Sequence, residues 1–192
     1  EYQVKCLERI KEYLCLLYEW RQKNEEILHQ FGEEAALDFP AKAWSKLNRM
    51  FQSYHSRKDG MGRPLPCFCI KVPTGGGKTF LAVKTIDLIN TTYLKKQTGL
   101  VLWVVPTTQI YRQTLQNLRN RDHPYRQHLD LASGGRTLIF EKTDRFTPED
   151  VSENLCVLLL MLPSASRENR DVLRMFRDSG HFAEFFPPED HV

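Results

Sequence analysis

Apolar residues recur at helical spacing over the first thirty positions of the chain. Steps of three and four separate most neighbours in the set Val4, Leu7, Ile10, Leu14, Leu17, Ile27, Leu28 and Phe31, with a gap between Leu17 and Ile27. This period predicts one long amphipathic helix, or two in succession, over residues 3–31, with the intervening charged residues on a solvated face.

A break at residues 38–40, which contain a proline, separates this segment from a second one. A helix is predicted over residues 41–54, with Trp44, Leu47 and Phe51 on one side. Residues 56–66 are rich in glycine and proline and are predicted to form an exposed loop.

From residue 67 onward, short apolar runs alternate with helical patterns. Strands are predicted at residues 67–72, 100–105, 137–140 and 155–162, and helices at residues 78–94, 108–120 and 167–179. Strands that alternate with helices indicate a parallel sheet with crossover helices. Because the runs LVLWVV and LCVLLLML show no polar alternation, both faces of those two strands are expected to be covered, as in a three-layer α/β domain.

Composition restricts the class of protein without pointing to one function. The 192 residues suit one domain, or one domain with an appendage, and the apolar share of 41% and charged share of 27% are ordinary for a soluble globular protein. No run of eighteen apolar residues occurs, so no membrane span is expected. The net charge of +3 permits nucleic-acid binding but does not argue for it alone.

The cysteines are odd in number and scattered, and no secretory signal accompanies them. They are Cys6, Cys15, Cys67, Cys69 and Cys156. This usage indicates reduced thiols and a cytoplasmic location. Cys67 and Cys69 have the spacing of a metal pair, but no second Cys/His pair follows at ligand spacing, so we expect both to be core residues on one face of the 67–72 strand.

Candidate chemistry lies at residues 73–79, which read PTGGGKT between a predicted strand and a predicted helix. Gly75, Gly76 and Gly77 lack Cβ atoms, so their backbone N–H groups can approach an anion closely. The helix N-terminus adds unpaired N–H groups and partial positive charge. Lys78 is expected to reach the β- and γ-phosphates of a nucleotide, and the Thr79 hydroxyl to coordinate Mg²⁺. A plain glycine-rich surface turn is the alternative, which the flanking strand and helix disfavour.

The loop departs from the general phosphate-loop pattern G-x-x-x-x-G-K-[ST], because Val72 stands where the first glycine is expected. Helicases and related translocases use the variant PTGxGKT, which does not need that glycine. All seven positions fit the variant: Pro73, Thr74, Gly75, Gly76, Gly77, Lys78 and Thr79.

Three stretches together resemble one family. They are VPTGGGKTFLAVKTI at residues 72–86, LVLWVVPTTQIYRQTLQNLRNRDHPYRQHLD at residues 100–130, and EYQVKCLERI at residues 1–10. The chain is similar to the first RecA-like domain of superfamily 2 helicases and translocases, and most like the Res subunit of type III restriction enzymes. The resemblance implies a partial RecA-like P-loop NTPase fold, the cofactors ATP and Mg²⁺, and DNA-dependent ATPase activity. It also implies double-stranded DNA and a methyltransferase or specificity subunit as partners.

The same resemblance assigns roles outside the glycine loop. Gln3 matches the glutamine of the helicase Q-motif, which reads adenine, with Tyr2 as its neighbour. A carboxamide offers one donor and one acceptor to adenine N6 and N7, although a lone exposed glutamine is the alternative. The second stretch matches motif Ia, which implies nucleic-acid backbone contacts for Pro106, Thr107, Thr108, Gln109 and Arg112. A plain threonine N-cap without a ligand is the alternative there.

The acidic residues that an NTPase needs for Mg²⁺ and for the attacking water are not found. Pro163-Ser164 follows the last predicted strand, and Glu141-Lys142 after the 137–140 strand is a poor match to a DEAH-like box. We therefore expect residues 1–66 to be an N-terminal helical segment with an insertion, and residues 67–192 to be a partial RecA-like domain. Such a truncated chain is expected to be inactive alone. The alternatives are another P-loop phosphotransferase, or a non-catalytic module that binds nucleotide or nucleic acid.

Overall fold

The computed structural model describes residues 2–47, 53–59 and 61–162. The chain forms two compact units, Glu1–Lys95 and Lys96–Val192, and each is described by itself. This division after Lys95 differs from the domain boundary that the sequence predicts between residues 66 and 67. That domain boundary stays a prediction.

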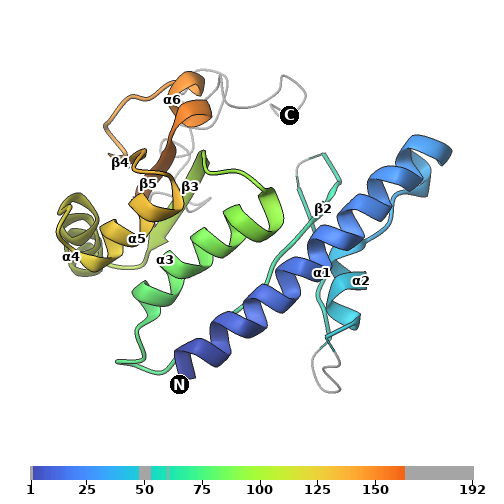
Figure 1. The fold of residues 1–192 in the computed structure, drawn as a ribbon, viewed down its shortest axis with the longest axis horizontal. Helices are drawn as coiled ribbons and strands as arrows, with labels where there is room; N and C mark the ends of the chain where they lie inside the picture. The colour runs from blue at the N-terminus through green and yellow to red at the C-terminus, as the bar shows by residue number, and fades with distance from the viewer. Residues whose placement is uncertain (1, 48–52, 60, 163–192) are drawn as a thin grey trace. The chain divides into compact units, whose positions relative to one another are not determined.

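The first unit is organised around one long helix, α1 (Tyr2–Phe31), followed by the short η1 (Glu33–Ala35). The middle of its apolar stripe is buried, at Ile10, Tyr13, Leu14 and Leu17. These side chains form a core with α2 (Phe39–Ser45), which packs along α1 (Figure 1). The prediction of a long amphipathic helix is confirmed, while its terminal members Val4 and Phe31 remain exposed.

Helix α2 is shorter than the sequence pattern predicts. Asp38 caps its start, because its side chain accepts a hydrogen bond from the Ala41 N–H at 3.1 Å. The helix ends at Ser45, and Phe51 lies outside the described residues. Tyr54 is not helical, since its hydroxyl donates to the Leu65 carbonyl at 3.4 Å and accepts from the Cys67 N–H at 3.3 Å. These tertiary contacts hold it away from a continuing helix.

The predicted loop at residues 56–66 contains a small antiparallel hairpin, β1 (Arg57–Lys58) with β2 (Pro64–Leu65). The predicted strand at residues 67–72 is wrong, because these residues pair with no strand among the described parts of the chain. Phe68 and Ile70 instead pack against the α1 core, and this burial against a helix explains their apolar character. Cys69 is exposed rather than buried in a core.

Helix α3 (Lys78–Leu88) begins at the predicted residue and continues into one π-helical turn, η2 (Ile89–Leu94). Leu88, Ile89 and Tyr93 pack on the same core as α1. The Arg21 guanidinium lies 4.8 Å from the centre of the Tyr93 ring. Helix α3 is thereby held against α1, and its first residue is fixed relative to the N-terminus of that helix.

The second unit contains a three-stranded parallel sheet in the order β3-β5-β4. The strands are β3 (Gly99–Val105), β4 (Thr137–Glu141) and β5 (Leu155–Met161). Helices α4 (Thr108–Arg119) and α5 (Pro124–Ala132) connect β3 to β4, and α6 (Pro148–Glu153) connects β4 to β5. This mixed α/β fold confirms the predicted class and is consistent with a partial RecA-like domain. The predicted helix at residues 167–179 lies outside the described residues.

The two continuously apolar strands differ in burial. Six successive residues of the central β5, Leu155 to Leu160, are at most 2% exposed, which confirms that both of its faces are covered. The prediction is wrong for β3, where Leu102 is 49% and Val104 is 42% exposed. β3 lies at an edge of the described sheet, so it has strand and helix neighbours on fewer sides.

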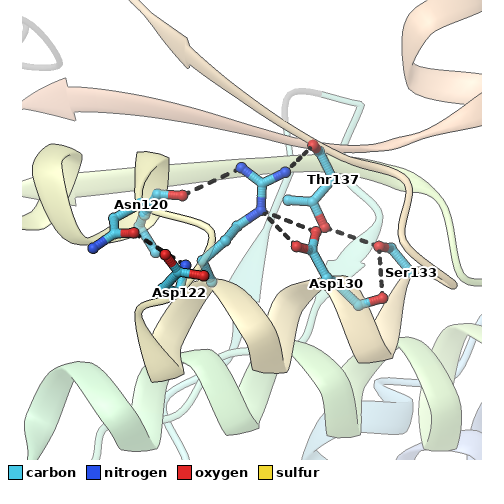
Figure 2. Close-up of polar contacts among 7 residues, drawn as sticks. Asn120, Asp122, Asp130, Ser133 and Thr137 are labelled. Carbon is cyan, nitrogen blue, oxygen red and sulfur yellow. Dashed lines mark hydrogen bonds and ion pairs between the residues drawn. The ribbon is translucent and has the colours of Figure 1, made fainter.

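A buried arginine joins three elements of the second unit, and Figure 2 shows its partners Asp130 and Thr137. Arg126 on α5 is 7% exposed. Its Nε donates to both carboxylate oxygens of Asp130, at 2.9 and 3.0 Å, and its other nitrogens donate to the carbonyls of Leu118 at 3.3 Å and Thr137 at 2.8 Å. Ser133 and Thr137 add a hydroxyl pair at 2.8 Å. The network fixes the end of α4 and the start of β4 to α5.

We predict that Arg126→Ala lowers the free energy of unfolding by about 2–4 kcal/mol, because two carbonyls and a carboxylate lose their donor. Urea unfolding of the chain measures this loss. Arg121→Ala is the matched control, since Arg121 is exposed, and its effect should stay within about 0.5 kcal/mol. Equal effects of the two substitutions would contradict a structural role for the network.

The Cys156 thiol is predicted to resist alkylation in the folded chain. It is fully buried in β5, and burial, with a smaller contribution from Asp150, raises the pKa of Cys156 to about 11. Because the thiolate is the reactive form, little reactive species exists at about pH 8. Mass spectrometry after iodoacetamide treatment should show labelling of the exposed Cys15 and Cys69, and labelling of Cys156 only after denaturation. Early labelling of Cys156 would show that β5 is not central.

Candidate nucleotide and nucleic-acid sites

Two different constraints require glycine in the phosphate loop. Gly75 and Gly77 both adopt a φ of 78°, a left-handed conformation that side chains disfavour. A Cβ at Gly76 would lie 2.7 Å from Val72 Cγ1 and 3.0 Å from the Pro73 carbonyl oxygen. A loop with these constraints is a tight turn that leads into α3 rather than an extended surface segment.

The loop closes on itself around the carbonyl of Pro73. The Gly76 N–H donates to this oxygen at 3.0 Å, and so does Lys78 Nζ, at 3.0 Å. The Lys78 ammonium therefore lies directly over the turn and is exposed. Thr79 follows in the first turn of α3, where backbone N–H groups have no acceptor within the helix. The turn, the cation and the helix start therefore lie together, which is the arrangement that the predicted phosphate site requires.

Gln3 belongs to this arrangement although 73 residues separate it from its hydrogen-bond partner. Its Nε2 donates to the Gly76 carbonyl at 3.1 Å, and a Cβ on Gly77 would collide with the same amide. The neighbouring Tyr2 hydroxyl donates to the Lys71 carbonyl at 3.4 Å. The start of α1 is thus attached to the loop, and the structure brings Gln3, Gly76, Gly77 and Lys78 together.

The described residues provide neither a cluster of metal ligands nor a membrane-spanning helix. No group of three or more His, Cys, Asp or Glu side chains is arranged there to hold a metal ion. None of the described helices combines the length and apolar character that crossing a bilayer requires. The contact between Thr79 and Mg²⁺ stays a prediction.

The second candidate site lies at the start of α4, directly after β3. Thr107 is the N-cap, and its Oγ1 accepts from the Ile110 N–H at 3.3 Å. The Thr108 hydroxyl donates to Met161 Sδ at 3.6 Å, which joins α4 to the end of β5. All five predicted contact residues are exposed: Pro106, Thr107, Thr108, Gln109 and Arg112. Both threonines therefore have structural partners, while the first amides of the helix face no helical acceptor.

A cluster around Glu141 was not predicted. Tyr111 donates to Glu141 Oε2 at 2.9 Å, and Arg119 pairs with Oε1 at 2.7 Å and with Asp144 at 3.5 Å. Burial, followed by the hydrogen bond to Glu141, raises the pKa of Tyr111 to about 12. The carboxylate at the end of β4 therefore anchors α4 at two points. The spacing of eight residues between Tyr111 and Arg119, two turns on one helix face, was the signal available in the sequence.

One of the comparisons with known proteins identifies a family. The family model described as type III restriction enzyme, res subunit, matches residues 1–171. Neither the curated proteins nor the solved structures gave a match. Because the matched segment covers well over half of the chain and includes the loop, Gln3 and the start of α4, the protein belongs to the family of type III restriction enzyme Res subunits, a helicase-type ATPase family.

Proposed function

We propose that this chain is the ATP-binding part of a DNA-dependent ATPase and translocase, the restriction subunit of a type III restriction enzyme. The observation that carries the proposal is the attachment of Gln3 to a glycine turn that ends at Lys78. Gln3, whose carboxamide can read a base, therefore lies next to a turn that can hold phosphates. Family membership supports nucleotide binding in general.

Within this proposal, the amides of Gly75, Gly76 and Gly77 bind the phosphates of ATP, with Pro73 and Thr74 shaping the turn. Lys78 exchanges the Pro73 carbonyl for phosphate oxygens, a favourable exchange because the new partners are charged. The Thr79 hydroxyl is a ligand for Mg²⁺, which would supply charge neutralisation at the phosphates. The free acceptor and second donor of the Gln3 carboxamide read the adenine edge.

We place DNA contacts at the start of α4, at Pro106, Thr107, Thr108, Gln109 and Arg112. The exposed helix start and the Arg112 guanidinium suit a phosphate backbone, which needs donors and positive charge but no base-specific groups. The Glu141 cluster supports this role, because it holds α4 at both ends against β4. A methyltransferase or specificity subunit as partner and a cytoplasmic location follow from the family alone.

Hydrolysis needs carboxylates that this proposal does not assign to the described residues. Glu141, at the end of β4, is engaged by Tyr111 and Arg119. We therefore propose that the 192-residue chain binds ATP weakly and does not turn it over, and that hydrolysis belongs to the intact enzyme. Activity of the isolated chain would contradict this division.

Lys78→Ala should weaken Mg²⁺–ATP binding by about tenfold or more, because the loop loses its only full charge; tenfold corresponds to about 1.4 kcal/mol. Isothermal titration calorimetry measures the affinity. Lys11→Ala is the matched control, since Lys11 is an exposed lysine of the same unit. In the intact enzyme, an ATP turnover by Lys78→Ala equal to that of the wild type would overturn the proposal.

Arg112→Ala should weaken duplex DNA binding regardless of sequence. The loss of one phosphate contact should reduce the slope of log K against log salt by about 0.9. Fluorescence anisotropy at several salt concentrations gives this slope. Arg121→Ala removes an exposed arginine located beyond the far end of α4 and should leave the slope unchanged. An identical slope for Arg112→Ala and wild type would place the DNA elsewhere.

A further inference from the structure

The first unit contains a groove that the proposed ATP site does not use. Two pockets, of about 410 and 730 Å³, share Trp44, Phe68, Cys69 and Lys71 among their lining residues and are therefore neighbours on this unit. Together they make a depression lined by residues of α1, α2, the hairpin and the segment before the phosphate loop. Neither Gln3 nor any residue from 73 to 79 lines it. We call it the aromatic–basic groove, defined by Lys5, Trp44, Tyr54, Arg57, Phe68 and Lys71.

The floor of the aromatic–basic groove is made of rings that hold one another in place. Tyr13 is buried and meets Trp44 edge-on at 5.4 Å and Phe68 edge-on at 5.8 Å between ring centres. Tyr54 lies 5.8 Å from Trp44. Trp44, Tyr54 and Phe68 are each half-buried, so part of each ring is available to the groove. Fixed, partly exposed rings are the platform on which flat nucleobases stack.

The rim of the groove carries positive charge. Lys5, Arg57 and Lys71 are exposed lining residues, and Arg9, which pairs with Glu12 at 2.9 Å, lies beside them. Among the described residues that line the two pockets there is no aspartate or glutamate. The charged side chains that line the depression are therefore basic, and an anionic ligand is favoured.

We propose that the aromatic–basic groove binds a single-stranded nucleic acid, with bases against Trp44, Tyr54 and Phe68 and phosphates along Lys5, Arg57 and Lys71. An acidic peptide would satisfy the cations but leave the rings without flat partners. A duplex would offer phosphates but keep its bases stacked inside. Alternating rings and cations suit a strand that is both charged and unstacked. The site lies in a different unit from the start of α4, so it adds to the proposed DNA contact.

The test uses the 192-residue chain and a short fluorescein-labelled oligo-dT, without ATP, followed by anisotropy. Lys71→Ala and Arg57→Ala should each weaken binding severalfold and reduce the slope of log K against log salt by about 0.7. Lys11→Ala is the matched control, since Lys11 lies on α1 but lines another pocket, and it should bind as the wild type does. Lys78→Ala should also bind normally, so failure of the ATP proposal and failure of this one are distinguishable.

A separate measurement tests whether bases stack on Trp44, Tyr54 and Phe68. Ultraviolet cross-linking of the oligonucleotide, mapped by mass spectrometry, should label peptides that contain Trp44, Tyr54 or Phe68. Trp44→Phe should keep most of the affinity and Trp44→Leu should lose it, with urea unfolding to confirm that both variants fold. If Trp44→Leu unfolds, the map of cross-linked peptides and the affinities of Lys71→Ala and Arg57→Ala decide the question.

Three results would overturn the proposal. Cross-links confined to residues 106–112, together with loss of binding in Arg112→Ala only, would place the strand at α4. Polyglutamate competing as well as unlabelled oligo-dT would show that charge alone is recognised. Weaker binding of AMP or ATP in Lys71→Ala, with oligo-dT binding unchanged, would assign the groove to the base of a mononucleotide.

Discussion

The burial of the α1 stripe against α2, α3 and residues 68–70 is the interaction on which the first unit depends. Full burial of a side chain such as Leu14 or Leu17 contributes about 1.5–3 kcal/mol, and the stripe places several such residues in one seam. This seam fixes where the first residues of α1 lie. Gln3 can therefore meet Gly76, a contact between residues distant in sequence that a single hydrogen bond of about 1 kcal/mol would not establish alone. The same seam holds Tyr13 against Trp44 and Phe68, so one packing event supports both the loop and the groove.

The sequence predicted correctly the elements that local residue patterns determine. The predictions failed where contacts between distant parts of the chain determine the structure. Local patterns predicted the long helix α1, the start of α3 at Lys78 and the three parallel strands. The spacing of hydrophobic residues and the positions of glycine and proline indicate such elements directly. Residues 67–72 were mistaken for a strand because an apolar run does not reveal whether it pairs with a sheet or packs on a helix. Helix α5 was missed because its buried face includes Arg126, a residue that pattern reading counts as exposed. Helix α6 has little apolar signal, although Thr147 and Asp150 form a capping box that marks its start.

In the candidate site too, local patterns predicted some features and missed those that depend on tertiary contacts. The glycines could be predicted because positive φ and close backbone approach both favour this residue type, and the structure shows positive φ at Gly75 and Gly77 and close approach at Gly76 and Gly77. The proximity of Gln3 to the loop came from family resemblance, since no spacing rule connects residues 3 and 76. The groove was invisible in the sequence because its rings and cations come from separate segments, among them a stretch to which the sequence assigned no role.

Glu141 has a side chain that could act as a catalytic acid, but Tyr111 and Arg119 bind its carboxylate. It ends a parallel strand, at the edge where catalytic carboxylates of α/β proteins are commonly found. Here both carboxylate oxygens have donors, Tyr111 and Arg119, and its own N–H donates to Asp144 at 2.7 Å. The elevated pKa of Tyr111 keeps the phenol protonated and the hydrogen bond in place across the physiological range. A carboxylate offers about four lone-pair sites, and at Glu141 two of them accept from side chains of α4 and so hold that helix in place. Position at the end of a parallel strand therefore does not by itself identify a catalytic acid, because the same carboxylate also anchors a helix.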